Sequence, residues 1–221
     1  GDELSAAAAA REAAGDVRAA AALLRQWQAT SPDDPAPVEA ALALAGRTSS
    51  AEDETVALRA LGHLHLRANR PAEAHEAFEQ LAKKRPGDRD ALDGKRQAAR
   101  AMGDLDEFAR STRTVASADL DADDAPHAAD ILGELLALRP DDVEARLLRT
   151  KALTRAGRRD DAVVEFGHLA DALPKRCTRR LEREAATYAR STLAHLAPEE
   201  AELLTRFQRM LDAPERSKRI L

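Results

Sequence analysis

The sequence predicts an all-α protein, a solenoid of about eleven or twelve antiparallel helices, and three observations support this fold class. Of 221 residues, 50 are alanine and only nine are valine or isoleucine, whereas β-sheets favour β-branched and aromatic side chains. Apolar residues recur at helical spacing along most of the chain. One pattern of small and large apolar residues also repeats, as expected for stacked helical units.

Four prolines give the register of this repeat. The interval from Pro32 to Pro86 equals the interval from Pro86 to Pro140, and Pro174 follows at a shorter interval. Twelve, eight and five residues before each proline stand a small residue and then two large apolar residues. These offsets place the three side chains on one helical face, and proline then ends the helix. The positions predicted to be buried include Ala20, Leu24, Trp27, Ala74, Phe78, Ala128, Leu132, Ala162, Phe166 and Leu169.

A second helix is expected before each of these segments. Its clearest copy contains Leu61 and Gly62. The helix that follows has Ala74 and Phe78 at the repeated positions, and Pro86 closes it. These residues resemble the tetratricopeptide repeat (TPR), a helix–turn–helix unit of about 34 residues with Leu-Gly in its first helix and a closing proline. The resemblance implies a right-handed TPR-like α-solenoid with a C-terminal capping hairpin.

The register divides the chain into TPR-like repeats over 1–176 and a C-terminal part over 177–221. Single-helix insertions are expected near 35–54 and 89–108, and an alternative grouping pairs the helices of 89–118 and leaves 125–138 alone. In the last copy, Arg149-Thr150 replaces Leu-Gly, so its first helix packs differently or the register shifts. Full copies are expected near 1–34, 55–88, 109–142 and 143–176. The loops beside the insertions, expected to be irregular and to turn the superhelix, are 48–54 and 119–124.

The C-terminal part is predicted to form a different hairpin. One helix runs from Cys177 to Leu196, and Pro198 opens the next. A solenoid needs an atypical end to cover its last apolar face, so a cap is the first interpretation and a partner-docking module the second. The apolar face of the last helix is Leu203, Leu204, Phe207 and Leu211. A basic tail with Arg216, Lys218 and Arg219 closes the chain.

Charge and composition exclude several classes of protein. The net charge is −5, and the body over 1–174 is acidic while 175–221 is basic, which argues against a dedicated nucleic-acid binder. No apolar run is long enough for a membrane span. The single cysteine, and a start at Gly1 that we interpret as trimmed, leave the compartment open between periplasm and cytoplasm.

No catalytic or metal-binding motif is recognised, so we expect a non-catalytic protein with no cofactor and no metal. Asp119, Asp121, Asp123 and Asp124 alternate as in calcium loops, but the glycine such loops need is absent. Asp123 or Asp124 is better interpreted as the N-cap of the next helix. His65 is expected in the core. Cys177, between basic residues, is interpreted as a surface thiol, with a lowered pKa and reactivity as the alternative.

The resemblance implies a scaffold that holds a partner protein or peptide in its groove. The Ala-, Arg- and Asp-rich composition indicates a GC-rich bacterium, in which similar repeats often scaffold cell-envelope machines for secretion, pilus assembly or polysaccharide export. The alternative is a recruitment module within a larger enzyme or transporter.

In TPR proteins the first helix of each pair lines the groove, so the resemblance also implies candidate site residues. Cations recur there at helical spacing, which favours an acidic segment or a C-terminal carboxylate as ligand. The alternative is a solvated stripe balanced by neighbouring acids. His63 and Gly94 stand where the carboxylate clamp of chaperone-binding relatives has asparagine, so a chaperone tail is not implied. The candidate groove residues are Arg59, His63, Leu66, Arg67, Arg113, Leu147, Lys151 and Arg155.

Overall fold

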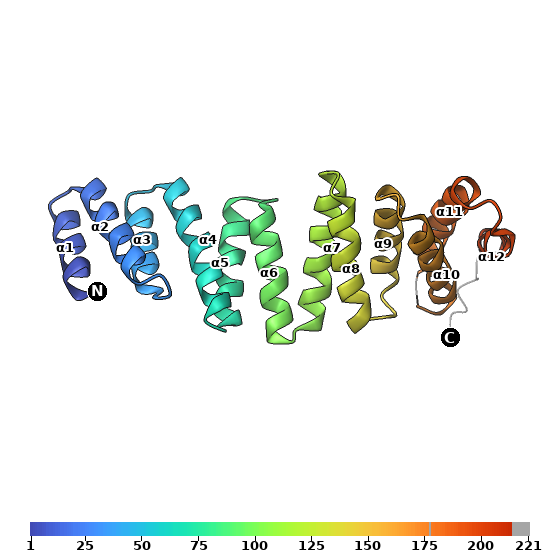
Figure 1. Ribbon diagram of the computed structural model, residues 1–221, viewed down its shortest axis with the longest axis horizontal. Helices are drawn as coiled ribbons and strands as arrows, with labels where there is room; N and C mark the ends of the chain where they lie inside the picture. Colours follow the sequence, from blue (N-terminus) through green and yellow to red (C-terminus); the bar gives the residue numbers. More distant parts are fainter. Residues whose placement is uncertain (177, 214–221) are drawn as a thin grey trace, which may run out of the picture. The chain divides into compact units, whose positions relative to one another are not determined.

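The computed structural model describes residues 1–176 and 178–213, and in this part of the chain it contains twelve α-helices and no strand (Figure 1). The chain forms two compact units, Gly1–Ser111 and Thr112–Leu221, which are described separately below. The all-α class and the helix number are confirmed. The helices are α1 (Asp2–Ala13), α2 (Val17–Thr30), α3 (Ala36–Arg47), α4 (Ala51–Arg67), α5 (Pro71–Lys84), α6 (Arg89–Met102), α7 (Leu105–Asp121), α8 (Ala125–Leu138), α9 (Val143–Arg155), α10 (Arg159–Arg176), α11 (Arg179–Leu196) and α12 (Ala201–Asp212).

Six of the connections are tight turns of one kind. In each, a left-handed residue follows the helix, and the next backbone N–H donates to the carbonyl five residues earlier at 2.8–3.1 Å. This is the Schellman geometry, which favours Gly or Asn because a Cβ is strained at positive φ. The left-handed residues are Gly15, Ser49, Asn69, Gly103, Asp123 and Gly157.

Four other connections contain proline and form a second kind of turn. Around Pro32, Pro86, Pro140 and Pro198, the residue two places after proline donates its N–H to the carbonyl just before proline, at 3.1 Å each time. Proline at the second position of such a turn has its φ already set. Pro198 therefore does not open the last helix, as the sequence predicted, but turns the chain before α12 begins at Ala201.

The two kinds of turn explain why the first three prolines are evenly spaced. Between Pro32 and Pro86 lie three helices, α3, α4 and α5, joined by two Schellman turns, and between Pro86 and Pro140 lie α6, α7 and α8, joined in the same way. The helix expected in each insertion is therefore present, as α3 and α6. Each belongs to a three-helix group that repeats once without a gap.

Three predicted helix boundaries are wrong. Segments 48–54 and 119–124 are not loops throughout: α4 already begins at Ala51, and α7 continues to Asp121, so each connection is a turn of only three residues. Ser50 caps α4 by accepting a hydrogen bond from the Asp53 N–H, and the acidic first turn suits the positive end of that helix. Pro174 does not stop α10, which continues to Arg176. Cys177, Arg216, Lys218 and Arg219 lie outside the described residues.

The core of the first unit confirms the predicted register. Phe78 of α5 is fully buried, and its ring lies against Gly62 of α4 and Gly94 of α6. A Cβ at either glycine would come within about 2.6 Å of the ring, so only glycine fits there. His65 is buried, as expected. A separate cluster contains Ala20, Leu24 and Trp27 of α2 with Ala8 and Leu44.

The core of the second unit follows the same register. Phe166 of α10 is fully buried, and its ring centroid lies 6.2 Å from that of Tyr188 and 6.3 Å from that of Phe207. These contacts join α10 to α11 and α12. All ten positions named above as predicted to be buried, in both units, are at most 8% exposed.

Where the last copy lacks Leu-Gly, charged side chains join its two helices. Glu165 of α10 is buried and accepts hydrogen bonds from Arg146 at 2.7 Å and Arg149 at 2.5 Å, both on α9. Arg146 also donates to the carbonyl of Pro140 at 2.7 Å. Thr150 is fully buried beside them, and its hydroxyl donates to the Arg146 carbonyl. The first helix of this copy therefore does pack differently.

Candidate functional site

Two of the predicted groove residues, Arg59 and His63, form an ion-pair cluster in the first unit. Arg59 of α4 donates to Asp88 at 2.7 Å, and its Nε lies 3.0 Å from Asp90. His63, one turn further along α4, has its Nε2 3.2 Å from the Asp90 carboxylate. Because Asp88 is the N-cap of α6, these contacts fasten α4 to the first turn of α6.

The other two predicted residues on α4 behave differently. Arg67 is exposed, and its Nε lies 4.0 Å from Asp33, a carboxylate that is itself 89% exposed. Leu66 is half-buried and packs against the cluster around Phe78. Solvent screens the Arg67 pair strongly, so this cation remains open to other anions.

In the second unit, Arg113 repeats the Arg59 arrangement, one proline interval further along the chain. Its guanidinium lies 2.5 Å from Asp142, the N-cap of α9, and 3.3 Å from Glu144. At the other end of the same two helices, Arg155 donates to the carbonyl of Leu120 at 3.0 Å. The first contact joins the middle of α7 to the start of α9, and the second joins the end of α7 to the end of α9. The two helices are therefore parallel neighbours.

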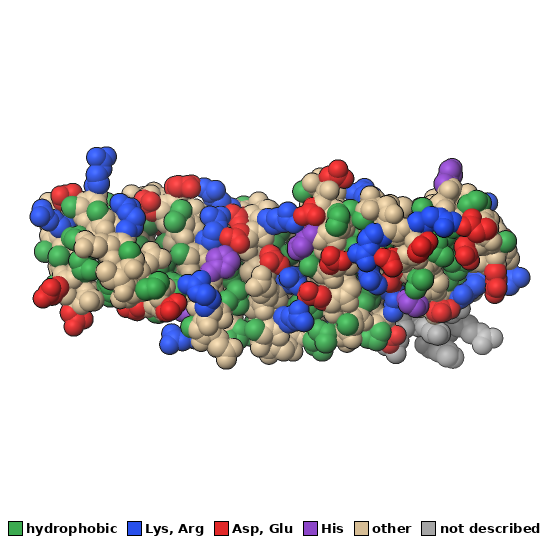
Figure 2. Space-filling model, viewed as in Figure 1, with side chains coloured by type: hydrophobic (Ala, Val, Ile, Leu, Met, Phe, Trp, Pro, Cys, Tyr) green, Lys and Arg blue, Asp and Glu red, His purple; other side chains and the backbone are tan. Residues whose placement is uncertain are grey.

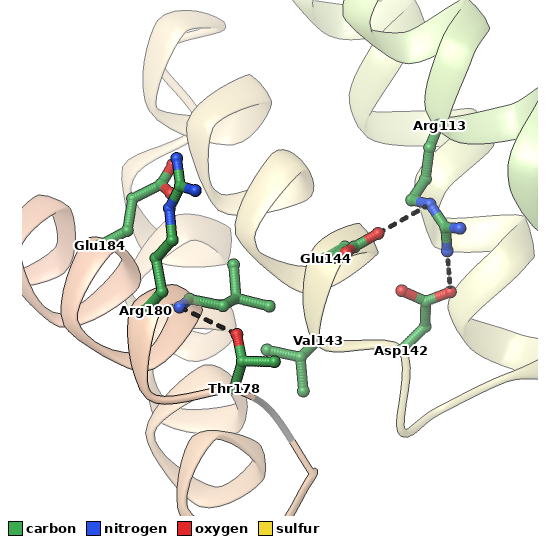
Figure 3. A pocket seen from close by; sticks show the side chains of 8 residues that line it. Arg113, Asp142, Val143, Glu144, Thr178, Arg180 and Glu184 are labelled. Carbon is green, nitrogen blue, oxygen red and sulfur yellow. Dashed lines mark hydrogen bonds and ion pairs between the residues drawn. The ribbon is translucent and has the colours of Figure 1, made fainter.

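A groove opens where the starts of α9 and α11 meet Arg113 (Figure 3). Its volume is about 460 Å³. Figure 3 shows Arg113 turned toward the two carboxylates of α9, while Arg180 and Glu184 project from α11 on the opposite side. The lining residues are Arg113, Asp142, Val143, Glu144, Thr178, Arg180, Leu181 and Glu184.

The same face continues along α9 and α11 beyond this groove. Lys151, two turns after Glu144, has its Nζ 5.5 Å from the ring centroid of Tyr188, which lies one turn after Glu184. This is a cation–π distance. The contact shows that α9 and α11 are also parallel, so α7, α9 and α11 form a row. We call the face with Lys151, Arg180 and Tyr188 the α9–α11 groove. Leu147, which lies between Glu144 and Lys151 on α9, is only 4% exposed and so is a core residue.

The charges of this groove are mixed in sign. On the face drawn in Figure 2, Lys and Arg side chains of the described residues lie among Asp and Glu side chains. In the described part of the chain, Lys151, Arg155 and Arg180 have no carboxylate within 4.0 Å, whereas Arg113 has two. Of these three, Lys151 and Arg180 belong to the groove, whereas Arg155 reaches toward α7 and donates to the Leu120 carbonyl.

A second group of polar side chains lies at the α7–α8 turn. His127 Nδ1 and the buried Asp119 carboxylate are 2.6 Å apart, and these two residues with Asp124 could hold a metal ion. Asp124 is the N-cap of α8, as predicted, since its carboxylate accepts a hydrogen bond from the His127 N–H. Hydrogen bonding accounts for this arrangement.

Within 1–176 and 178–213, no helix combines the length and the apolar character that crossing a bilayer requires.

Sequence reasoning missed the acidic residues and the whole α11 side of the groove. Asp142 and Glu144 belong to a different helix from Arg113, with all of α8 between them, so spacing along one helix could not reveal them. The available signal was the repeat of the three-helix group, which relates Arg59, Asp88 and Asp90 to Arg113, Asp142 and Glu144 at one constant offset.

Comparison with known proteins finds likeness only to solved structures. No protein-family model matches the chain, and no curated protein matches it significantly. The chain is similar to MamA from Desulfovibrio magneticus RS-1, with 14% identity, 97% of each chain covered and a TM-score of 0.36. It is similar to YrrB, a TPR protein with an unusual peptide-binding site, with 14% identity, 86% and 92% covered and a TM-score of 0.39.

A Podospora anserina putative kinesin light chain with nearly identical TPR-like repeats covers 98% of this chain over 97% of its own length, with 17% identity and a TM-score of 0.39. At these scores, the evidence for the repeat is the chain's own helix pairs, turns and buried register. By that evidence the protein is an all-α, TPR-like helical-repeat protein.

Proposed function

We propose that the protein is a non-catalytic scaffold that binds an acidic segment of a partner protein in the α9–α11 groove. The observation that carries this proposal is the pair of cations without acidic partners on neighbouring parallel helices, Lys151 of α9 and Arg180 of α11. A carboxylate from a ligand would complete ion pairs that the chain itself leaves open. Tyr188 adds a flat amphipathic surface of the kind enriched in protein interfaces.

Arg59 and Arg113 act differently in this proposal. Each is already ion-paired with carboxylates of the next parallel helix. In this proposal each therefore holds two neighbouring helices together and does not bind the ligand. His63 and Arg67 on α4 would offer weaker contacts of their own in the first unit. The setting in a bacterial cell-envelope assembly belongs to the same proposal: composition favours the bacterial source, and the cell-envelope role rests on the resemblance to TPR repeats alone.

A peptide selection tests this function and requires no identified partner. A random-peptide phage library is panned against the full chain, and the selected peptides are synthesised and measured by fluorescence anisotropy. We expect Asp and Glu to be enriched and the affinity to fall as salt rises, because the attraction joins exposed charges. The double variant Lys151→Glu/Arg180→Glu should bind at least about tenfold more weakly.

The matched control is Arg18→Glu/Arg190→Glu, which makes the same charge change at two exposed arginines outside the groove. It should keep wild-type affinity apart from a small general effect of net charge. Selected peptides without acidic residues, or equal losses in the two double variants, would refute the proposal.

A further inference from the structure

An apolar groove in the first unit is not explained by the proposed function. It runs over α3, with α2 on one side and α4 on the other. Val17 of α2 and Val56 of α4 border it and are 39% and 53% exposed, which makes them two of the most exposed large apolar side chains in the described part of the chain. Apolar residues exposed together beside a cavity are typical of a binding surface.

The floor of this groove is open because its side chains are small. Alanines from all three helices line it together with Val38 and Leu44, and its volume is about 130 Å³. A cavity of about 150 Å³ holds a benzene molecule, so this space accommodates one branched aliphatic side chain. The alanines are Ala21, Ala41, Ala45, Ala57 and Ala60.

The two ends of the groove differ in charge. Consecutive helices are antiparallel, so the start of α4 with Asp53 lies at one end, and Arg25 of α2 lies nearer the other end with Val38 and Ala60. Asp53 keeps its negative charge at the first end, where its carboxylate accepts a hydrogen bond from the Ser50 hydroxyl at 2.6 Å. Arg25 is exposed and has no carboxylate within 4.0 Å in the described residues. The end of the groove beside Arg25 is therefore positive and has no acidic partner of its own.

We propose that this groove docks an acidic amphipathic helix of a partner protein. The helix inserts one leucine-sized side chain between Val17 and Val56, and a carboxylate one turn further along pairs with Arg25. The proposal goes beyond the α9–α11 groove, because it places a second, apolar contact in the other unit of the chain.

Trp27 provides a local reporter for the test. It is the only tryptophan of the chain and packs in the cluster that contains Leu44, a residue of the groove floor. Two alanine-rich helical peptides of about 16 residues serve as probes. Both carry one leucine, followed four residues later by glutamate in the first peptide and by lysine in the second. Binding to the full chain is measured by the change in Trp27 fluorescence emission.

We expect the leucine–glutamate peptide to bind at least about tenfold more tightly than the leucine–lysine peptide. Val56→Gln should weaken binding by at least about tenfold, because it removes one apolar edge of the groove. Arg25→Gln should abolish the preference for glutamate. The matched control is Val164→Gln on α10, where the valine is 59% exposed and lines no described cavity; it should bind like wild type.

Three results would overturn this inference. The first is that neither peptide changes Trp27 emission at millimolar concentration. The second is that Val164→Gln weakens binding as much as Val56→Gln, and the third is that Arg25→Gln leaves the preference for the glutamate peptide intact. The Lys151→Glu/Arg180→Glu variant separates the two proposals, since binding in the first unit predicts no change. Loss of peptide binding in that variant would move the peptide to the α9–α11 groove, which contradicts this inference and leaves the proposed function standing.

Discussion

Arg113 of α7 and Asp142, the N-cap of α9, are joined by an ion pair of 2.5 Å that repeats the pair made by Arg59 and Asp88 one proline interval earlier in the chain. In both places, an arginine on one helix neutralises the carboxylate that caps a parallel helix. The arginines that the sequence offers as ligand-binding groups therefore also fasten the helices together.

A double-mutant cycle measures this structural role. Arg113→Met removes the charge, and Asp142→Ser removes the carboxylate but keeps a residue that can cap α9. Because Arg113 is 25% and Asp142 only 9% exposed, we expect a coupling of about 1–2 kcal/mol in the free energy of unfolding, measured by urea denaturation. Additive effects of the two substitutions would show that the pair contributes no stability.

The contact between Phe78 and Gly94 predicts an unusual response to alanine. Gly94→Ala should lower the free energy of unfolding by about 1–3 kcal/mol, because the new Cβ would overlap the ring. Gly167, inside α10, has no atom within 4 Å of such a Cβ, so Gly167→Ala should stabilise by up to about 1 kcal/mol. Urea melts that show the same sign for both variants would contradict this packing.

The buried Glu165 should be essential to the α9–α10 pair. Glu165→Ala leaves Arg146 and Arg149 without their shared carboxylate, and we expect a loss of about 2–4 kcal/mol in the free energy of unfolding. Asp161→Asn breaks the exposed pair between Asp161 of α10 and Arg158, the residue just before this helix, and should cost less than about 1 kcal/mol. Comparable losses in the two variants would argue against a buried network.

Acid should destabilise the first unit in part through Glu107. Burial alone would raise its pKa, but hydrogen bonds from Ser111 and Arg110, with Lys95 nearby, outweigh burial and hold the pKa below its ordinary value. Its stabilising contribution is therefore complete above about pH 4.3, the unfolded value, and is lost as the pH falls through the lower folded value.

Glu107→Gln should accordingly reduce the loss of stability between pH 5 and pH 3, measured as the urea midpoint at several pH values. His75, whose Nε2 lies 3.7 Å from the Glu107 carboxylate, faces the same group, so the comparison is made against His75→Gln as well. An acid slope that Glu107→Gln leaves unchanged would show that this carboxylate is not responsible.

The sequence predicts the buried register well because burial depends on local spacing. Phe78 and Phe166 fill the same slot of two repeats, and both are fully buried. The helix boundaries at Ala51 and Arg176 were missed, because polar residues such as Glu52 and Asp53 suit a first helical turn as well as a loop. Candidate cations were placed on helices correctly, but their partners on later helices depend on how successive helices align.

The most direct test of the scaffold proposal is the location of a bound ligand. The full chain, labelled with ¹³C at lysine and tyrosine side chains, is titrated with an acidic peptide obtained by selection and followed by NMR. We predict that the resonances of Lys151 and Tyr188, whose side chains meet in the α9–α11 groove, shift first and together. Shifts at other lysines, with the signals of Lys151 and Tyr188 unmoved at saturation, would contradict the scaffold proposal.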